Sequence, residues 1–233
     1  MINSFLEYIS LEKKYSVNTV TAYKNDLISF RDFLLLEYNQ DNLLEVHYPQ
    51  IRNWIVSLVD ANISNRTINR KVSSLKSFYK YLQKSEQIVI NPLSKHKALK
   101  IAKKVQIPFT TKEINAVIEN ISKENNFTST RNKLIVELFY STGIRRTELI
   151  NIKENNISLS NGTIKVLGKR NKERFVPLLT SVAVTLKNYL EIKKDYSKNL
   201  DELFITENGN KIYETLVYRI INSYFSQVSS KVK

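Results

Sequence analysis

The chain has 233 residues and carries 36 Lys and Arg against 22 Asp and Glu, a formal net charge of +14 that favours strongly anionic partners. It contains no cysteine, which excludes disulfides, thiolate metal sites and cysteine nucleophiles. Hydrophobic residues make up 42% of the chain, while Gly and Pro number only four each, so we expect a folded and mainly helical protein.

Several functional classes receive no support from the composition. No apolar stretch approaches the ~20 residues needed to span a bilayer, and the residues after Met1 show no signal-peptide pattern. His47 and His96 lie far apart in the sequence with no other ligand types nearby, so no metal site is expected. We therefore expect a cytoplasmic protein that needs no cofactor and binds no membrane.

The N-terminal part of the chain is predicted to be helical. Apolar residues recur at spacings of three and four after Ser16, which is the expected N-cap of a long amphipathic helix. A short amphipathic segment around Phe5 precedes this helix, and another follows Pro49. The expected core positions of the long helix are Val20, Tyr23, Leu27, Phe30 and Leu34.

A fourth helical segment, residues 64–84, has two contrasting faces, and Ser64 is its expected N-cap. One face is an apolar stripe. The other combines cations with short polar side chains and contains no acid: Arg66, Asn69, Arg70, Ser73, Ser77 and Lys80. A merely solvated face usually mixes Glu with Lys, so we predict that Arg66, Arg70 and Lys80 contact nucleic acid phosphates.

After Asn91-Pro92 the helical periodicity stops in a lysine-rich stretch. We expect a basic linker at residues 101–109, between one domain at residues 1–100 and a second at residues 110–233. Lys103 and Lys104 in this linker are candidates to follow a DNA backbone.

The second half is predicted to alternate helices with a small sheet. A helix beginning at Thr110 or Thr111 is followed by another that ends at Gly143, where a positive φ angle is expected. Asn161-Gly162 and a second reversal at residues 168–171 predict a three-stranded antiparallel meander, and Lys169 lies at the second turn. Helices are expected again towards the C-terminus.

The residue types present favour metal-free phosphate chemistry. The sequence has no glycine-rich phosphate loop and no tight carboxylate cluster that could hold a catalytic metal. Guanidinium groups stabilise charge on phosphate oxygens, and a positioned lysine can donate a proton to a leaving oxygen. Arg145 at a helix junction and Lys169 at a hairpin turn are suitable groups for these two tasks.

Two motifs resemble those of the tyrosine recombinases, in particular the Xer-type site-specific recombinases and the phage-type integrases. "YSTGIRRTEL" at residues 140–149 is similar to their Thr-Gly-(Leu/Ile)-Arg-x-x-Glu-Leu box, and "VLGKRNKERFVPL" at residues 166–178 is similar to their lysine hairpin. The N-terminal segments "TVTAYKNDLISFRDFL" and "SNRTINRKVSSLKSFYKYL" resemble the family's core-binding domain. The resemblance covers nearly the whole chain in order.

The resemblance implies a mainly α fold: a SAM-like four-helix core-binding domain and a mostly helical catalytic domain with a small three-stranded antiparallel sheet, together clamped around duplex DNA. It implies that Arg145 stabilises the scissile phosphate in the transition state. Lys169 is implied to act as the general acid toward the 5′-hydroxyl, and Glu148 to support the site. Arg146, Lys172 and Arg174 are candidates for phosphate contact.

The family's remaining catalytic motifs do not occur in this sequence. No histidine follows His96, so the His-x-x-Arg box is absent, and Tyr213, Tyr218 and Tyr224 lie in a stretch expected to be structural. We therefore expect a catalytic domain truncated before that box and before the tyrosine nucleophile, in a chain that binds DNA but does not cleave it alone.

Three functions stay open from the sequence. The first is a recombinase that cleaves and rejoins duplex DNA through a 3′-phosphotyrosyl intermediate and, at full length, assembles with other protomers into a synaptic tetramer. The second is a non-catalytic DNA-binding accessory or regulatory protein. The third is a generic RNA-binding protein.

Overall fold

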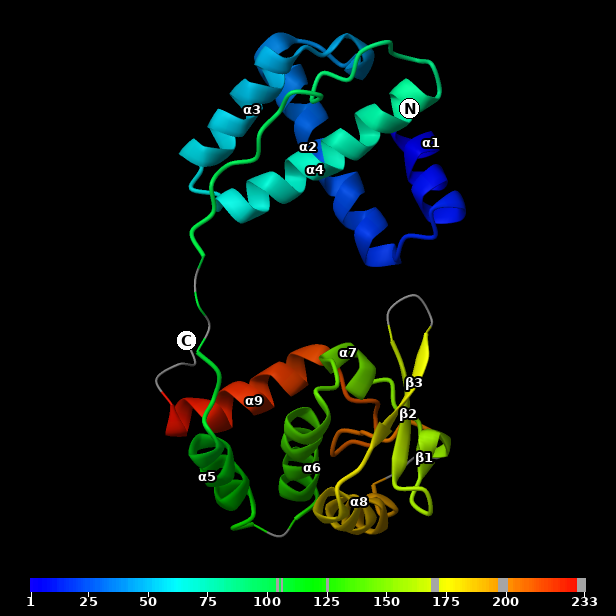
Figure 1. Cartoon of the computed structure of the whole chain (residues 1–233), viewed down its shortest axis with the longest axis vertical. Coiled ribbons are helices and arrows are strands. Elements are labelled where there is room, and N and C mark those ends of the chain that lie inside the picture. The colour runs from blue at the N-terminus through cyan, green and yellow to red at the C-terminus, as the bar shows by residue number, and fades with distance from the viewer. Residues whose placement is uncertain (104, 106, 125, 169–171, 197–200, 230–233) are drawn as a thin grey trace. The chain divides into compact units, whose positions relative to one another are not determined.

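The computed structural model describes the chain except for residues 104, 106, 125, 169–171, 197–200 and 230–233. The chain divides into two compact units, Met1–Lys104 and Val105–Lys233, each with its own hydrophobic core. The described residues are mostly helical, with one small sheet in the second unit (Figure 1). The mainly α fold class is confirmed, whereas the exact domain and linker boundaries stay a prediction.

The first unit is built from helices packed around one apolar core. Ser16 and Ser64 cap α2 and α4 by accepting the backbone N–H of Thr19 and Thr67, as the sequence predicts. The core is rich in aromatic side chains, including Phe30 and Trp54 with ring centroids 5.0 Å apart. The elements are α1 (Ile2–Glu7), a π-helical turn (Tyr8–Glu12), α2 (Val17–Tyr38), a 3₁₀ turn (Leu43–Glu45), α3 (Tyr48–Asp60) and α4 (Asn65–Lys84).

The start of the lysine-rich stretch after α4 packs on the first unit. Leu93 is fully buried in the core of the first unit, and Leu99 packs against the same core. These two leucines are too far apart to form a helical stripe, so helical periodicity gives no sign of their packing. The chain up to Leu99 therefore belongs to the first unit.

The second unit combines helices with a three-stranded antiparallel meander in the order β1-β2-β3. Its core lies between α6, α8, the inner face of the sheet and the segment around Phe204, which is fully buried. The elements are α5 (Thr111–Ile121), α6 (Phe127–Thr142), α7 (Arg146–Leu149), a 3₁₀ turn (Glu154–Asn156), β1 (Ile157–Ser158), β2 (Thr163–Leu167), β3 (Glu173–Pro177), α8 (Thr180–Lys193) and α9 (Glu214–Val228).

The strand register separates an inner and an outer face of the β2–β3 hairpin. Ile164 and Val176 are paired across the strands and buried, whereas Phe175 is 71% exposed on the other face. Arg174, paired with Val166, lies on the same face as these buried residues. The hairpin therefore presents a guanidinium toward the body of the unit.

Candidate active site and nucleic-acid interface

Arg145 lies at a bend between two helices. The α6 helix ends at Gly143, whose φ of +61° is the left-handed conformation that ends many helices. Ile144 is buried and anchors the bend, and Arg145 is the N-cap of α7 with extended backbone angles. Its side chain is 67% exposed. The backbone of Arg145 is therefore fixed by the bend, while its guanidinium faces solvent.

Glu148 holds Arg145 in this position. One carboxylate oxygen, Oε2, accepts the backbone N–H of Arg145 at 2.9 Å, and Oε1 accepts Nη1 of the same residue at 2.9 Å. A carboxylate in the first turn also suits the positive end of a helix. Only 3% of the Glu148 side chain is exposed, so this contact is largely shielded from water.

Arg174 joins the same carboxylate from the β-hairpin. Its Nη1 and Nη2 atoms donate to Oε1 and Oε2 of Glu148, both at 2.8 Å, in the paired geometry that suits guanidinium and carboxylate. Glu148 therefore ties α7 to β3 and holds two arginines at one point. Arg174 is also a predicted phosphate contact, and its side chain is 40% exposed while its guanidinium pairs with Glu148.

The ionised form of Glu148 is strongly favoured. The hydrogen bonds from Arg174, together with the backbone and side-chain hydrogen bonds from Arg145, lower its pKa from the ordinary 4.5 to about 2, although burial opposes this shift. At neutral pH the carboxylate is therefore a permanent negative charge between two cations.

Gly168 makes the close approach of the hairpin to Glu148 and Arg174 feasible. Its backbone N–H donates to the carbonyl of Lys172 at 2.7 Å. A Cβ atom at this position would lie 3.3 Å from Nη1 of Arg174 and 3.4 Å from Oε1 of Glu148, so a larger residue would crowd the pair. Lys169, the next residue in the chain, lies outside the described residues.

The other candidate cations of the second unit have different surroundings. Arg146 donates to Glu214 at the start of α9, with 2.6 Å between Nη2 and Oε2. It therefore bridges two elements, and its side chain remains 44% exposed. Lys172 is exposed.

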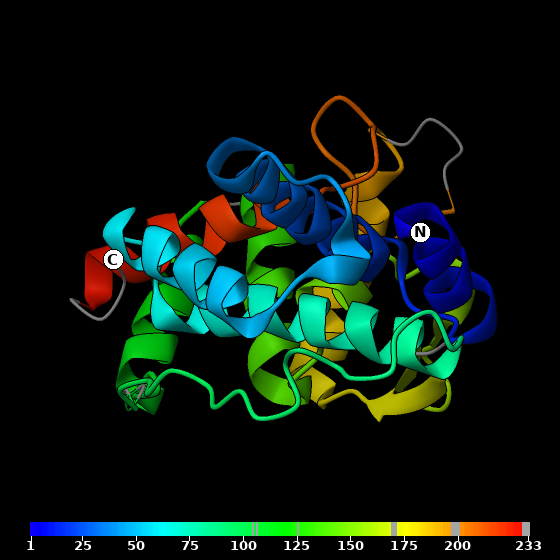
Figure 2. The ribbon, with the colours of Figure 1, turned by 90° about the horizontal axis from the view of Figure 1, so that it is seen from above.

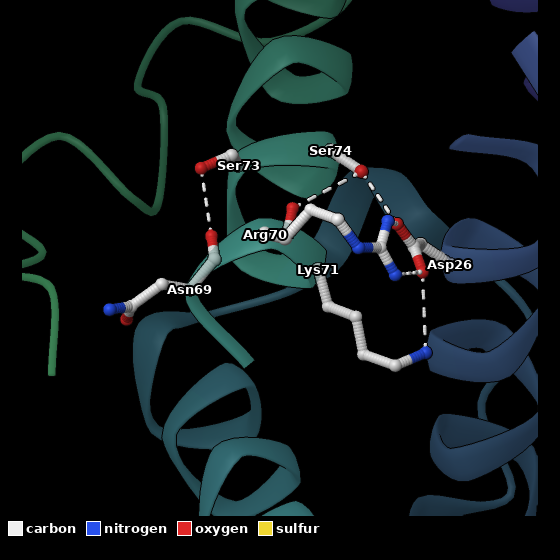
Figure 3. Close-up of polar contacts among 6 residues, drawn as sticks. All are labelled: Asp26, Asn69, Arg70, Lys71, Ser73 and Ser74. Atoms are coloured by element: carbon white, nitrogen blue, oxygen red, sulfur yellow. Dashed lines mark hydrogen bonds and ion pairs between the residues drawn. The ribbon is translucent and has the colours of Figure 1, made fainter. Parts of the chain in front are cut away.

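In the first unit, Arg66 and Lys80 are exposed on one side of α4, and within the described part of the chain neither forms an ion pair. Arg70 differs because its guanidinium donates to both carboxylate oxygens of Asp26, at 2.5 and 2.9 Å (Figure 3). Asp26 comes from α2 and also accepts from Lys71 and Ser74. Arg70 is thus engaged in packing two helices together.

Of the two linker lysines predicted to contact DNA, only one belongs to the described residues. Lys103 is exposed, and Lys104 lies outside the described residues. The structure places Arg145, Glu148 and Arg174 together in the second unit, and Arg66 and Lys80 on α4 of the first.

Sequence reasoning did not identify two polar residues that organise the first unit, Asp26 and Asn69. Asp26 is 1% exposed and follows Tyr23 by three positions, on the apolar side of its helix. A carboxylate in such a place requires a cationic partner, and this requirement is the only sequence signal for the pairing of Asp26. No sequence signal identifies Asn69, because its partner is a backbone segment.

Two absences hold for the described part of the chain. It contains no group of three or more His, Asp or Glu side chains arranged to hold a metal ion. Likewise, none of the described helices combines the length and apolar character needed to cross a bilayer.

Comparison with known proteins identifies the family. Residues 2–86 match the phage integrase N-terminal SAM-like domain, and residues 108–231 match the phage integrase family. The chain is 34% identical over 220 residues to the tyrosine recombinase XerC of Staphylococcus aureus (strain MRSA252), with 94% of this chain and 73% of that protein covered.

Solved structures share the fold. The XerH site-specific recombinase bound to difH in a pre-cleavage complex has a TM-score of 0.71 at 18% identity, covering 98% of this chain and 68% of that chain. The lambda integrase tetramer bound to a Holliday junction has a TM-score of 0.72 at 14% identity, covering 98% of this chain and 65% of that chain. The fold and the sequence matches define an integrase-type protein. The chain belongs to the phage integrase family, and the relative that it matches at 34% identity is a tyrosine recombinase, XerC. The resemblance read from the sequence is confirmed.

Proposed function

We propose that this chain binds duplex DNA and positions a phosphodiester for the strand exchange of a site-specific tyrosine recombinase. The observation that carries the proposal is the buried Glu148 carboxylate, which fixes the exposed Arg145 and ties the lysine hairpin to the same point. Family membership and a net charge of +14 support the same conclusion.

The proposed roles follow from the chemistry of each group. The Arg145 guanidinium pairs with the non-bridging oxygens of the scissile phosphate and offsets the charge that develops there. Lys169 gives a proton to the 5′-oxygen as it leaves. Glu148 does not touch the phosphate. It holds Arg145, and through Arg174 it holds β3, the strand that follows Lys169 in the chain. No step requires a metal ion or a cofactor.

Duplex DNA is the proposed macromolecular partner. The solved structures that share the fold include a recombinase on its DNA substrate and an integrase tetramer on a Holliday junction. We propose that the exposed cations Arg66, Lys80, Lys103 and Lys172 contact phosphates, and that other recombinase protomers are the protein partners. Lys104 and Arg146 stay further candidates for phosphate contact, as do Arg70 and Arg174, whose paired side chains remain 49% and 40% exposed. Competition between duplex DNA and duplex RNA at fixed salt tests this partner, and stronger binding to RNA would contradict it.

We further propose that the 233-residue chain does not form a covalent DNA adduct by itself. No histidine follows His96. Of its C-terminal tyrosines, Tyr213 accepts a hydrogen bond from Arg219 and Tyr224 accepts one from Asn132, so the donor to each of these hydroxyl groups is a residue other than Arg145. Incubation with a nicked suicide duplex tests this point. Any tyrosine-linked adduct formed by this chain would overturn it.

A non-catalytic DNA-binding accessory role is the second candidate, because a net charge of +14 and the exposed cations of α4 serve DNA binding without a cleavage step. Both candidates share the same DNA surface. They differ when the chain is mixed with a cleavage-competent recombinase. Partnership in catalysis predicts that the Arg145→Ala variant reduces strand exchange in the mixture. An accessory role predicts that this variant, at a concentration that saturates the DNA, supports exchange as well as the unaltered chain does.

A further inference from the structure

The lysine-rich segment at residues 93–103, here called the basic strap, returns along α4 in the opposite direction. Figure 2 shows this green segment running beside α4. The Nδ2 atom of Asn69 donates to the carbonyl of Leu99 at 2.9 Å, and Oδ1 of Asn69 accepts the N–H of the same residue at 2.9 Å. The Nδ2 atom of Asn65, one turn earlier, donates to the carbonyl of Lys100 at 2.9 Å.

These contacts leave the charges of the basic strap free. An asparagine amide is both donor and acceptor, so it can pair with both polar groups of one backbone residue, as a neighbouring strand does. Because the strap is held through its backbone and through Leu93 and Leu99, its ammonium groups remain in solvent. The exposed lysines of the strap are Lys95, Lys97, Lys100 and Lys103.

The two asparagines also border the cationic face of α4. At about 100° per residue, Lys80 and Arg66 lie within about 60° of Asn69 around the helix axis. The Arg70–Asp26 pair occupies the other flank, so Asn69 and Asp26 lie on different sides of α4 (Figure 3). The strap and the exposed face of α4 are therefore adjacent.

We propose that Asn65 and Asn69 are positioning residues that dock the basic strap on α4 before DNA arrives, so that strap lysines and α4 cations form one phosphate-binding surface. The inference rests on the proposed function in DNA binding. Asn65 and Asn69 carry no charge and need not contact a phosphate, but they contribute to DNA affinity by holding the strap in place. Without the asparagines, the basic strap must become ordered on α4 at the moment when DNA binds, which costs conformational entropy. The apparent DNA affinity is then the affinity of the docked form multiplied by the fraction of molecules in which the strap is docked.

Salt dependence distinguishes positioning from direct contact. The slope of log affinity against log salt reports the number of phosphates neutralised, with about 0.9 per contact. The Asn65→Ala/Asn69→Ala variant loses three hydrogen bonds, each of which changes the docking equilibrium about two- to tenfold. At the lower end of that range docking weakens about eightfold, so duplex binding by this variant should weaken by up to about eightfold. Its slope should equal that of the unaltered chain. The Lys97→Ala/Lys100→Ala variant should instead lower the slope by about one for each lysine that contacts a phosphate.

A matched control and an independent readout complete the experiment. Asn53→Ala removes another asparagine hydrogen bond, 2.6 Å from Nδ2 to the Tyr38 hydroxyl, away from α4 and the strap, and should bind as the unaltered chain does. Hydrogen exchange without DNA should be faster at the Leu99 amide in Asn69→Ala, and this single variant carries the test if the double variant unfolds.

Two results would overturn the inference in different ways. If the double asparagine variant binds as the unaltered chain does, while Arg66→Ala/Lys80→Ala binds more weakly, strap docking does not matter but the DNA-binding proposal stands. If the unaltered chain shows no salt-dependent binding to duplex DNA, the proposed function itself fails.

Discussion

The Glu148→Gln substitution removes the negative charge that links α7 to the β-hairpin while nearly preserving side-chain size. The pKa of Glu148 falls from 4.5 to about 2 in the folded protein, chiefly through the hydrogen bonds of Arg174. At about 1.4 kcal/mol for each pH unit, the ionised form stabilises the fold by about 3 kcal/mol more than the neutral form does. The second unit of the variant should therefore be about 3 kcal/mol less stable at pH 7.

The pH dependence has a definite sign. A carboxylate whose pKa is lowered on folding contributes stability that is fully present above about pH 4.5 and disappears as the pH falls toward 2. The difference between the unaltered chain and Glu148→Gln should therefore be constant above pH 5 or so and shrink at lower pH.

The chain offers an internal control for this experiment. Its single tryptophan, Trp54, is buried in the first unit. During urea unfolding, tryptophan fluorescence reports the first unit, and far-UV circular dichroism reports both units. Glu148→Gln should shift the part of the circular dichroism transition that belongs to the second unit. It should leave the fluorescence transition of Trp54 unchanged. A stability loss below about 1 kcal/mol, or one that is the same at pH 3 and pH 7, would refute the electrostatic reasoning.

Two further substitutions test the packing of the polar clusters. Gly168→Ala should destabilise the second unit by about 1 kcal/mol, because the added Cβ would lie 3.2 Å from the backbone carbonyl oxygen of Lys172 and 3.3 Å from Nη1 of Arg174. A gain in urea stability would show that both neighbours move away without cost. Asp26→Asn should destabilise the first unit by about 2–3 kcal/mol above pH 4, since the pKa of Asp26 is lowered by hydrogen bonds from Arg70 and Ser74 despite the opposing effect of burial. Trp54 fluorescence measures this loss, and an unchanged midpoint would show that Asp26 does not hold α2 and α4 together.

The elements with strong local signals were predictable from the sequence. Ser16 and Ser64 cap their helices, and Gly143 ends α6 with a positive φ, because these residues act on their own neighbours. The meander was also predictable, since Asn161-Gly162 favours a tight hairpin turn. Arg145 and Glu148 were assigned together from one short motif.

The pairings between distant segments were not predictable in the same way. Arg174 meets Glu148 only because β3 folds back on α7, so the sequence shows two charges and not their contact. Arg70 likewise looks free on its helix until Asp26 of α2 is placed beside it. The docking of the strap on Asn69 depends on backbone groups, which every residue carries and which therefore leave no signal in the side-chain pattern.

The most direct test of the account is the salt dependence of duplex DNA binding by the Arg145→Ala variant. The comparison uses the unaltered chain and Arg31→Ala, which removes an arginine paired with Asp32 in the first unit. If Glu148 fixes Arg145 to meet a DNA phosphate, the slope for Arg145→Ala should fall by about one while that for Arg31→Ala stays unchanged. Coincident lines for Arg145→Ala and the unaltered chain would contradict the account, because Arg145 would then face solvent and not DNA.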